Sequence, residues 1–511
     1  MLSIVKSMSL QGLEGFLVDV QVDVSAGMPN WEVVGLPDAT VKESKERVRT
    51  AIKNSGFDFQ SRRIVINLAP ADTRKEGSFF DLPIAIGILI DFQDIKFQEL
   101  NDTVFIGELS LNGKLNKVNG ILPMCIEAKK LGIKRIILPE ENAKEAAIVA
   151  DLEVIGATNL KEVVEYLNEN YDIKPTETNV HEIFHKKHKY AFDFSEVKGQ
   201  ENIKRALEVA AARSDIICSW SGTPGSGKTM LARRIPSILP DLTFEEALEI
   251  TKIHSIAGLL SKDTPILLER PFRSPHHTVT INSLIGGGKI PKPGEISLAH
   301  FGVLFLDELT EFNKNTLEVL RGPLEDREVT ISRINASLTY PCNFMFVASM
   351  NPCPCGFYGS KDKECTCTPE AISRYMGRIS GPLLDRIDIQ VEVTPVKYQK
   401  LESDERVETS EEIKARVDRA RKIQLERYKG HGIFSNSELT PHLSNIYCKL
   451  DLKSKEIVQN AFERLGLSAR GYGRILKVAR TIADLDGKED IEAKHIAEAI
   501  QYRSLDRKYW K

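Results

Sequence analysis

The spacing of hydrophobic and polar residues changes along the chain, and the first part combines two periods. Residues 17–24 alternate strictly between apolar and polar side chains, as a half-buried β-strand does. The same reasoning predicts further strands at 63–68 and 135–138, and helices at 42–56 and 122–132. Residues 1–170 therefore predict a mixed α/β domain.

The rest of the chain falls into three parts with different patterns. Residues 171–191 are polar and irregular and contain Pro175, which predicts a linker. Across residues 192–400, strand-like and helical segments alternate with glycine-rich turns, which is typical of a parallel sheet covered on both faces. Residues 401–511 are charged and amphipathic and show no clear strand pattern, so we expect an α-helical C-terminal domain.

Composition narrows the class of protein. The 511 residues are 42% hydrophobic and 28% charged, which is typical of a soluble globular chain with several domains. The longest apolar stretch, residues 82–90, is far shorter than the roughly 20 residues of a membrane-spanning helix. The N-terminus lacks the pattern of a secretory signal, so we expect a cytoplasmic protein with no membrane partner. The net charge of −3 neither favours nor excludes a nucleic acid, because basic residues can be confined to one channel.

A glycine-rich segment carries the strongest chemical signal. Its sequence, Gly-Thr-Pro-Gly-Ser-Gly-Lys-Thr, matches the complete phosphate-binding loop pattern. Glycines let backbone N–H groups turn toward phosphate oxygens, the lysine reaches the terminal phosphates, and the threonine hydroxyl ligates Mg²⁺. The predicted nucleotide-binding residues are Gly222, Thr223, Pro224, Gly225, Ser226, Gly227, Lys228 and Thr229.

Two later strands supply the expected partners of this loop. An apolar run ends in Asp307 and Glu308, which predicts that Asp307 joins Thr229 in holding Mg²⁺ and that Glu308 polarises the attacking water. Another apolar run ends at Asn351, where a sensor of the γ-phosphate belongs. The alternative, a buried strand with an acidic end by chance, does not account for both motifs together.

Two arginines are further candidates. Arg386 lies between acidic residues just before another strand and is predicted to reach the γ-phosphate of a neighbouring subunit, whereas the alternative is an intrachain salt bridge. Arg470 lies at a helix start in the C-terminal domain, suited to sensing phosphate, and an ordinary structural arginine is the alternative.

The segment before the phosphate-binding loop departs from the expected pattern. Residues 218–221, Cys-Ser-Trp-Ser, are more polar than the buried strand that normally stands there. Either a tolerated substitution or a local error in the sequence explains the difference. If the polar segment is real, we expect folding around Lys228 to be compromised.

Four of the eight cysteines lie within fifteen residues. Their pattern is C-x-C, nine residues, C-x-C, and four thiolates from one loop suit tetrahedral zinc. In a cytosolic chain such a group favours a metal over disulfides. Free or redox-active thiols are the alternative. The predicted ligands are Cys353, Cys355, Cys365 and Cys367.

Four segments together resemble the YifB/ComM family of magnesium-chelatase-like AAA+ ATPases, over essentially the whole chain. They are residues 270–278, 293–300, 320–328 and 351–356. The resemblance implies a central P-loop domain with a parallel sheet and hairpin inserts over 192–400, and a helical lid over 401–511. It also implies ATP and Mg²⁺ as cofactors, a hexameric ring, and branch migration of DNA during natural transformation.

The same resemblance assigns further residues. Gly199 and Gln200 lie where the adenine is gripped. Residues 273–294 and 326–340 correspond to inserts that face the ring channel in such proteins. Basic residues there become candidate contacts to branched or single-stranded DNA, with ordinary surface residues as the alternative: Lys289, Lys292 and Arg333.

The N-terminal domain resembles the protease domain of Lon, through residues 107–113 and 132–142. This implies an α/β domain like ribosomal S5 domain 2. Lon uses a serine and a lysine, but here Ser78 is offset from the matching position and residues 119–124 contain no lysine. A nucleophile without its base is not activated, so we expect no proteolysis.

The leading hypothesis is therefore an ATP-driven ring motor that moves DNA. A second is an ATPase that remodels a protein partner, as a chaperone or a chelatase activator. A nucleotide-dependent scaffold with little turnover is a third, and the intact Glu308 and Arg386 argue against it. A Lon-type peptidase is the least favoured hypothesis, because the dyad is missing.

Overall fold

The computed structural model describes residues 2–95, 100–185, 190–213, 217–261, 263–288, 291–333, 336–360, 363–396, 398, 402, 406–465 and 467–503. The chain forms two units. Unit 1 comprises Met1–Lys186 and Ala247–Leu267, and unit 2 comprises Lys187–Glu246 and Leu268–Lys511. Within the described part of the chain, no helix is both long and apolar enough to span a membrane.

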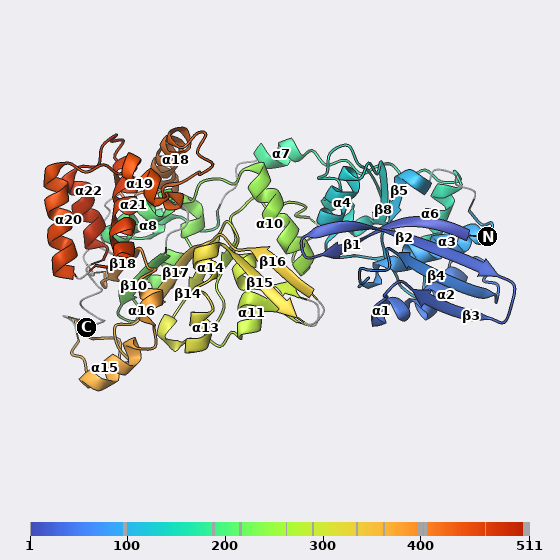
Figure 1. Ribbon diagram of the computed structural model, residues 1–511, viewed down its shortest axis with the longest axis horizontal. Helices are drawn as coiled ribbons and strands as arrows, with labels where there is room; N and C mark the ends of the chain where they lie inside the picture. Colours follow the sequence, from blue (N-terminus) through green and yellow to red (C-terminus); the bar gives the residue numbers. More distant parts are fainter. Residues whose placement is uncertain are drawn as a thin grey trace. The chain divides into compact units, whose positions relative to one another are not determined.

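Unit 1 is built on a seven-stranded mixed sheet in the order β3-β4-β2-β1-β5-β8-β9 (Figure 1). In β2 the valines at every second position, from Val18 to Val24, are buried, so the predicted alternation is confirmed. The strands are β1 (Leu2–Gln11), β2 (Glu14–Ser25), β3 (Asn30–Val34), β4 (Arg63–Ala69), β5 (Thr103–Phe105), β8 (Arg135–Pro139) and β9 (Glu153–Ala157), with a small hairpin of β6 (Glu108–Leu109) and β7 (Leu115–Asn116).

The helices of unit 1 include two that the helical period predicted, α2 and α4. By contrast, α3 is buried over all nine residues from Asp81 to Leu89, so it shows no amphipathic period. Its sequence stood out only as an apolar stretch. The helices are α1 (Ala39–Lys42), α2 (Ser44–Asn54), α3 (Asp81–Asp91), α4 (Ile121–Lys130), α5 (Glu140–Ala146), α6 (Leu160–Leu167) and α7 (Val180–His185). Helix α7 lies within the segment predicted as an irregular linker, which corrects that detail.

A segment from the middle of the sequence completes unit 1. Residues Ala247–Leu267 include most of α10 (Phe244–Ala257). The buried Ser255 donates a hydrogen bond to Glu145 and its carbonyl accepts one from Gly120 N–H at 3.1 Å. The sequence range 192–400 therefore includes residues that pack in the N-terminal unit.

Unit 2 contains a five-stranded parallel sheet in the order β11-β14-β17-β10-β18. The predicted parallel-sheet core is thereby confirmed. The polar segment before the phosphate-binding loop forms β10, the strand between β17 and β18, and its side chains are outside the described residues. The strands are β10 (Ile217–Gly222), β11 (Phe272–Arg273), β14 (Val303–Leu306), β17 (Met345–Met350) and β18 (Ile389–Val393).

Two hairpins stand outside this sheet. In Figure 1 the longer one, β15 with β16, lies on the opposite side of unit 2 from helices α20 and α22. The pairs are β12 (Gly286–Gly287) with β13 (Lys292–Pro293), and β15 (Glu328–Arg333) with β16 (Ala336–Pro341). The helices around the sheet are α8 (Glu201–Arg213), α9 (Lys228–Ala232), α11 (Ile281–Ile285), α12 (Glu295–Leu298), α13 (Lys314–Glu318), α14 (Pro323–Asp326), α15 (Pro369–Met376) and α16 (Gly381–Leu384).

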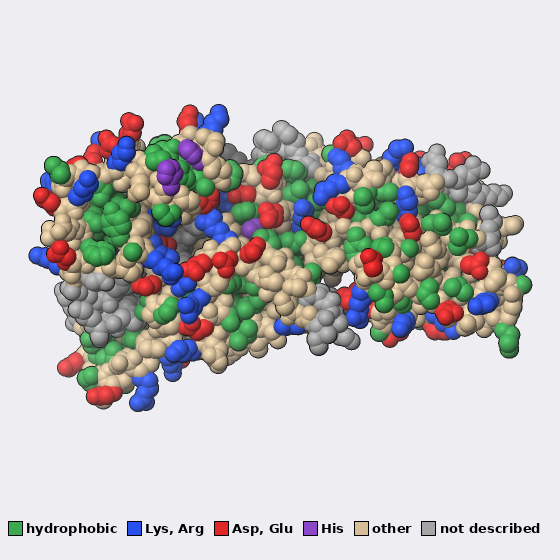
Figure 2. Space-filling view, in the orientation of Figure 1, with side chains coloured by type: hydrophobic (Ala, Val, Ile, Leu, Met, Phe, Trp, Pro, Cys, Tyr) green, Lys and Arg blue, Asp and Glu red, His purple; other side chains and the backbone are tan. Residues whose placement is uncertain are grey.

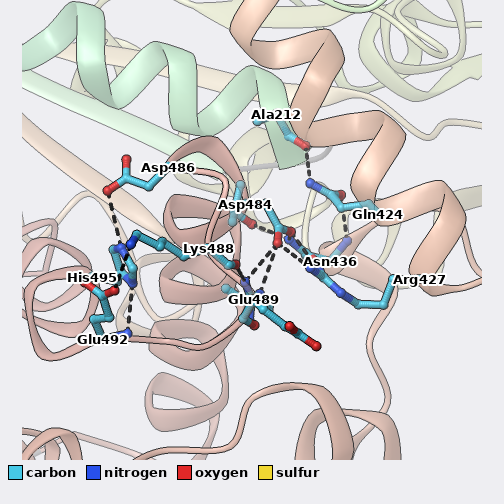
Figure 3. Close-up of polar contacts among 12 residues, drawn as sticks. Ala212, Gln424, Arg427, Asn436, Asp484, Asp486, Lys488, Glu489, Glu492 and His495 are labelled. Atoms are coloured by element: carbon cyan, nitrogen blue, oxygen red, sulfur yellow. Dashed lines mark hydrogen bonds and ion pairs between the residues drawn. The ribbon is translucent and has the colours of Figure 1, made fainter.

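The predicted helical C-terminal region is confirmed. Its helices are α18 (Ser410–Arg427), α19 (Pro441–Tyr447), α20 (Leu452–Leu465), α21 (Ala469–Leu485) and α22 (Ala493–Gln501). A buried polar network joins α18 and α21: the carboxylate of Asp484 accepts hydrogen bonds from Arg427 at 2.8 Å, Arg480 at 3.1 Å and Asn436 at 2.8 Å. Figure 3 shows Arg427 and Asn436 directed toward Asp484. Gln424 donates to the carbonyl of Ala212 at 3.0 Å and so ties α18 to α8.

Candidate nucleotide-binding site

The glycine-rich loop follows the carboxyl end of β10 and connects this strand to α9. Gly225 and Gly227 have φ angles of 78° and 83°, a left-handed conformation that favours glycine. Helix α9 then begins at Lys228. The loop and the start of α9 therefore have the strand–loop–helix arrangement that the motif predicts, with backbone N–H groups available for phosphate.

The ammonium group of Lys228 faces back across this loop. Its Nζ donates to the carbonyls of Gly222 at 2.8 Å and Thr223 at 3.1 Å, and to Asn351 Oδ1 at 3.1 Å. Burial lowers the pKa of Lys228, against the attraction of Asp307 and Glu308. The structure thus brings together the predicted phosphate-binding lysine and the predicted sensor asparagine, which are 123 residues apart in sequence.

A hydroxyl and a carboxylate meet beside Lys228. Thr229 Oγ1 donates to Asp307 Oδ2 at 2.6 Å, and Ser349 donates to the other carboxylate oxygen. These are the oxygen ligands that Mg²⁺ prefers, so the donor set of Thr229 and Asp307 fits a magnesium ion carried with a nucleotide. Ser349 did not emerge from the sequence, although it lies on β17, two positions before Asn351.

Glu308 directly follows Asp307 in a left-handed conformation, with φ of 54°, and its side chain is 56% exposed. Its Oε2 lies 3.9 Å from Nδ1 of His277, whose ring contacts Phe312 edge-on. The neighbouring His276 hydrogen-bonds with Thr278 at 2.9 Å, as expected of a loop histidine. The proximity of His277 to Glu308 was not predicted, because the two residues come from different loops.

The predicted adenine-gripping segment lies next to the phosphate-binding loop. Gln200 has φ of 64°, follows Gly199, and its Nε2 donates to Thr394 O at 2.7 Å and lies 3.5 Å from Ser226 O. A pocket of about 490 Å³ borders this contact. It is lined by Asn202, Arg205, Gln390, Val391, Glu392, Thr394, Glu498, Gln501 and Tyr502.

Arg386 is held inside its own chain. Its guanidinium is 7% exposed, forms an ion pair with Glu325 at 2.6 Å and donates to Pro382 O at 2.7 Å. This is the intrachain salt bridge that stood as the alternative, so in this conformation Arg386 does not extend toward a neighbouring subunit. Arg470 is 70% exposed and lies 3.7 Å from the same carboxylate oxygen of Glu325. Figure 2 shows charged side chains of both signs over the surface near α14 and α16.

The two inserts contact each other through side chains. Arg333 on β15 donates from Nη2 to Asn282 Oδ1 at 3.1 Å, and Tyr340 on β16 donates to Pro291 O at 2.9 Å. Arg333 and Lys292 are both exposed. Lys289, the third predicted DNA contact, lies outside the described residues.

The four clustered cysteines converge. The Sγ atom of Cys353 lies 3.3 Å from that of Cys355 and 3.7 Å from that of Cys365, and all four sulfurs, including Cys367, lie within 4.8 Å of one another. A tetrahedral zinc with bonds of about 2.3 Å places its sulfurs roughly 3.8 Å apart, so the group can hold one such ion.

In the Lon-like region, the hydrogen-bond partner of Ser78 is a carboxylate and not a lysine. Ser78 donates a hydrogen bond to Glu108, which is itself 3.1 Å from Asn116 Nδ2. Residues 119–124 include no lysine.

The five-stranded parallel sheet, the phosphate-binding loop and the acidic pair after β14 define a P-loop ATPase of the AAA+ type. Comparison with known families specifies the type. Residues 193–401 match magnesium chelatase subunit ChlI, residues 20–142 match the family called subunit ChlI of Mg-chelatase, and residues 407–503 match the C-terminal family of the same subunit.

Individual relatives agree with this assignment. The chain is 42% identical to competence protein ComM of Haemophilus influenzae over 510 residues, which is 99% of this chain and 98% of ComM. It is 42% identical to YifB of Escherichia coli over 511 residues, again 99% and 98% of the two chains. A stretch of 162 residues is 25% identical to Lon protease of Rhizobium meliloti, which is 29% of this chain and 20% of that protease. The chain belongs to the YifB/ComM family of magnesium-chelatase-like AAA+ proteins.

Proposed function

We propose that this protein is an ATP-hydrolysing ring motor that acts in the cytoplasm on branched or single-stranded DNA. Its task is branch migration during recombination of incoming DNA in natural transformation. The observation that carries the ATPase part is the convergence of Lys228, Thr229, Asp307 and Asn351 at one edge of the sheet. The DNA part rests on the competence name of the relative ComM and on the exposed basic residues of the inserts.

Each residue of the site has a defined task in this proposal. Lys228 exchanges its carbonyl partners for the terminal phosphates of ATP, and the loop N–H groups bind the remaining phosphate oxygens. Thr229 and Asp307 hold Mg²⁺, which neutralises charge developing on the phosphates. Glu308 is exposed and orients and polarises the attacking water, and Asn351 contacts the γ-phosphate.

The two arginines act after a rearrangement. Arg470 reaches the phosphates from the helical lid, because its guanidinium is largely exposed. Arg386 acts on the nucleotide of a neighbouring subunit once its ion pair with Glu325 opens. Assembly into a hexameric ring then brings each Arg386 to the adjoining site.

The inserts supply the contacts to DNA. Arg333 and Lys292 are exposed on adjacent hairpins, and a basic pair repeated around a ring holds a phosphate backbone without reading its sequence. Lys289 belongs to the same insert and is proposed for the same role.

We also propose Zn²⁺ as a bound structural ion, held by the four clustered cysteines. The sulfur separations of 3.3–3.7 Å support a single tetrahedral ion.

The test is strand release from a labelled four-way DNA junction by the full-length protein. With ATP the junction is expected to resolve into two duplexes, and with a non-hydrolysable ATP analogue it is expected to stay intact. ATP turnover without any resolution of the junction would contradict the proposal that the ATPase acts on DNA. That outcome would favour the second candidate, an ATPase that remodels a protein partner.

A further inference from the structure

The four-cysteine cluster lies directly against the nucleotide site, which gives it a task beyond local stability. Only Pro352 separates Asn351 from Cys353, and the side chain of Asn351 accepts a hydrogen bond from Lys228. The segment from residue 351 to residue 368 forms no helix or strand in its described part. Its position therefore depends on contacts other than a hydrogen-bonded ladder.

The contact with the phosphate-binding loop is close. Gly356 has φ of 84°, and a methyl group on its Cα would lie 2.5 Å from Cδ and 2.7 Å from Cγ of Pro224. Real Cβ atoms do not approach heavy atoms so closely, so the backbone of the cysteine loop rests on Pro224 with no spare room. Pro224 is the third residue of the phosphate-binding loop.

The cysteine loop is also organised around its own sulfur atoms. Tyr358 N–H points to Cys353 Sγ at 3.3 Å, and Cys355 N–H points to Cys367 Sγ at 3.4 Å. Backbone N–H groups of this kind support metal-bound thiolates and orient them. Cys353 is fully buried, whereas the other three cysteines are partly exposed.

We propose that a zinc ion on these four cysteines braces the phosphate-binding loop. The ion fixes the cysteine loop, the loop presses on Pro224 through Gly356, and the same loop anchors Asn351 beside Lys228. Zinc occupancy then sets the affinity for ATP, although zinc touches neither the nucleotide nor Lys228. The proposal rests on the nucleotide site described above, and it does not depend on the DNA load.

The test measures zinc content and ATP binding in full-length variants, in the absence of DNA. The native protein is expected to carry one zinc per chain by elemental analysis. Cys367→Ser is expected to lose it and to bind a fluorescent ATP analogue about tenfold more weakly. Cys448→Ser, which removes a buried thiol of the helical lid, is the matched control and should retain both properties.

A second variant separates the brace from metal binding and from misfolding. Gly356→Ala keeps all four ligands, so it is expected to retain zinc while binding ATP about tenfold more weakly, because its methyl group displaces Pro224. Adding Pro224→Ala removes the crowded ring atoms and should restore part of the affinity. Circular dichroism melts verify that each variant is folded.

Two results would overturn the proposal. If the native protein holds no zinc and gives no tetrahedral thiolate spectrum with Co²⁺, the four cysteines do not form a metal site. If zinc-free Cys367→Ser or folded Gly356→Ala binds ATP with unchanged affinity, the cysteine loop does not brace the phosphate-binding loop. Zinc content and ATP affinity are both measured without DNA, so they can be interpreted even if the junction assay fails.

Discussion

At the scale of single residues, the side chains of the site differ in how fully their polar atoms are hydrogen-bonded within the protein. Lys228 is occupied by two carbonyls and Asn351, and Asp307 by Thr229 and Ser349. Glu308, by contrast, is more than half exposed, and His277 lies 3.9 Å away. The residue proposed to act on water is therefore the one free to meet it.

This difference predicts the effect of Glu308→Gln. The amide keeps the size of the side chain but cannot polarise water as the carboxylate does, so ATP hydrolysis should fall by about 10²–10³-fold. Binding of ATP should change little, because Lys228, Thr229 and Asp307 remain. Equilibrium binding and steady-state phosphate release measure the two effects. Equal loss of both would mean that Glu308 holds the nucleotide instead.

Part of this site is predictable from sequence because its residues belong to local sequence motifs. Lys228, Thr229 and Asp307 each belong to a contiguous pattern, and Asn351 ends a recognisable strand. Ser349, His277 and Glu325 carry no such local signal. Their roles arise from contacts with Asp307, Glu308 and Arg386 that exist only once distant segments have folded together.

At the scale of elements, the helical lid depends on one buried carboxylate. Asp484 is fully buried and is contacted by Arg427, Arg480 and Asn436, which lie on two helices and a turn. Arg427 and Asn436 are labelled beside it in Figure 3. Removing one partner of a buried ion pair leaves the other charge uncompensated, which is more costly than losing the contact alone.

Asp484→Ala is therefore expected to lower the free energy of unfolding of the lid by about 3 kcal/mol. Arg480, only 2% exposed, would lose its carboxylate partner. Thermal and denaturant melts measure the change. Asp490→Ala, an exposed acid just beyond the same helix, is the matched control and should be nearly neutral. A similar small effect for both variants would contradict the role of the network.

The start of α22 predicts a pH dependence. Nδ1 of His495 accepts a hydrogen bond from Glu492 N–H at 2.9 Å, so its proton lies on Nε2, which faces Asp486 at 3.3 Å. Burial lowers the pKa of His495, against the attraction of Asp486, with Lys494 lowering it and Glu492 raising it. A lowered pKa means that the neutral ring stabilises the fold.

This stability is fully present above the ordinary histidine pKa of about 6.5 and is lost as pH falls through the lower pKa of the folded protein. Loss of the Nδ1 contact should cost about 1 kcal/mol. In His495→Asn the amide oxygen can accept the same bond without titrating, so its stability should depend less on pH below 6.5. Denaturant melts at several pH values compare the two proteins. Identical pH profiles would contradict the assignment.

Sequence pattern identified those elements whose two faces differ. β2, α2 and α4 were predicted because one face is buried and the other is not. Helix α3 was not recognised because it is buried all round. Segment Ala247–Leu267 packs in unit 1 through contacts such as Ser255 with Glu145, which no local pattern reveals.

At the scale of the whole molecule, the proposed load on the motor predicts a salt-dependent effect. Replacing both Arg333 and Lys292 with alanine removes two exposed basic groups from the inserts. DNA binding should weaken for all sequences alike. The plot of log binding constant against log salt concentration should become shallower, by the amount expected for the loss of about one to two phosphate contacts per subunit. DNA-free ATP hydrolysis should stay unchanged.

Binding isotherms at several salt concentrations provide the measurement. Lys453→Ala, at an exposed lysine on α20, is the matched control because it removes charge far from the inserts in sequence. If the double variant and the control have the same salt slope as the native protein, the inserts do not contact DNA.

The family, the parallel-sheet core and the helical C-terminal region were all predictable, because several motifs spread over the chain agree. DNA as the substrate was predicted only by resemblance and stays a proposal. A phosphate-binding loop identifies the nucleotide that an ATPase binds, whereas its macromolecular substrate depends on surfaces whose residues are individually ordinary.

The most direct measurement is therefore ATP turnover by the full-length protein, with and without a four-way DNA junction, beside Glu308→Gln. The account predicts strong stimulation of the native protein by the junction and near-complete loss of turnover in the variant. Robust turnover that ignores every DNA tested would leave the ATPase standing and contradict a DNA motor. Stimulated turnover that survives in Glu308→Gln would contradict the catalytic site itself.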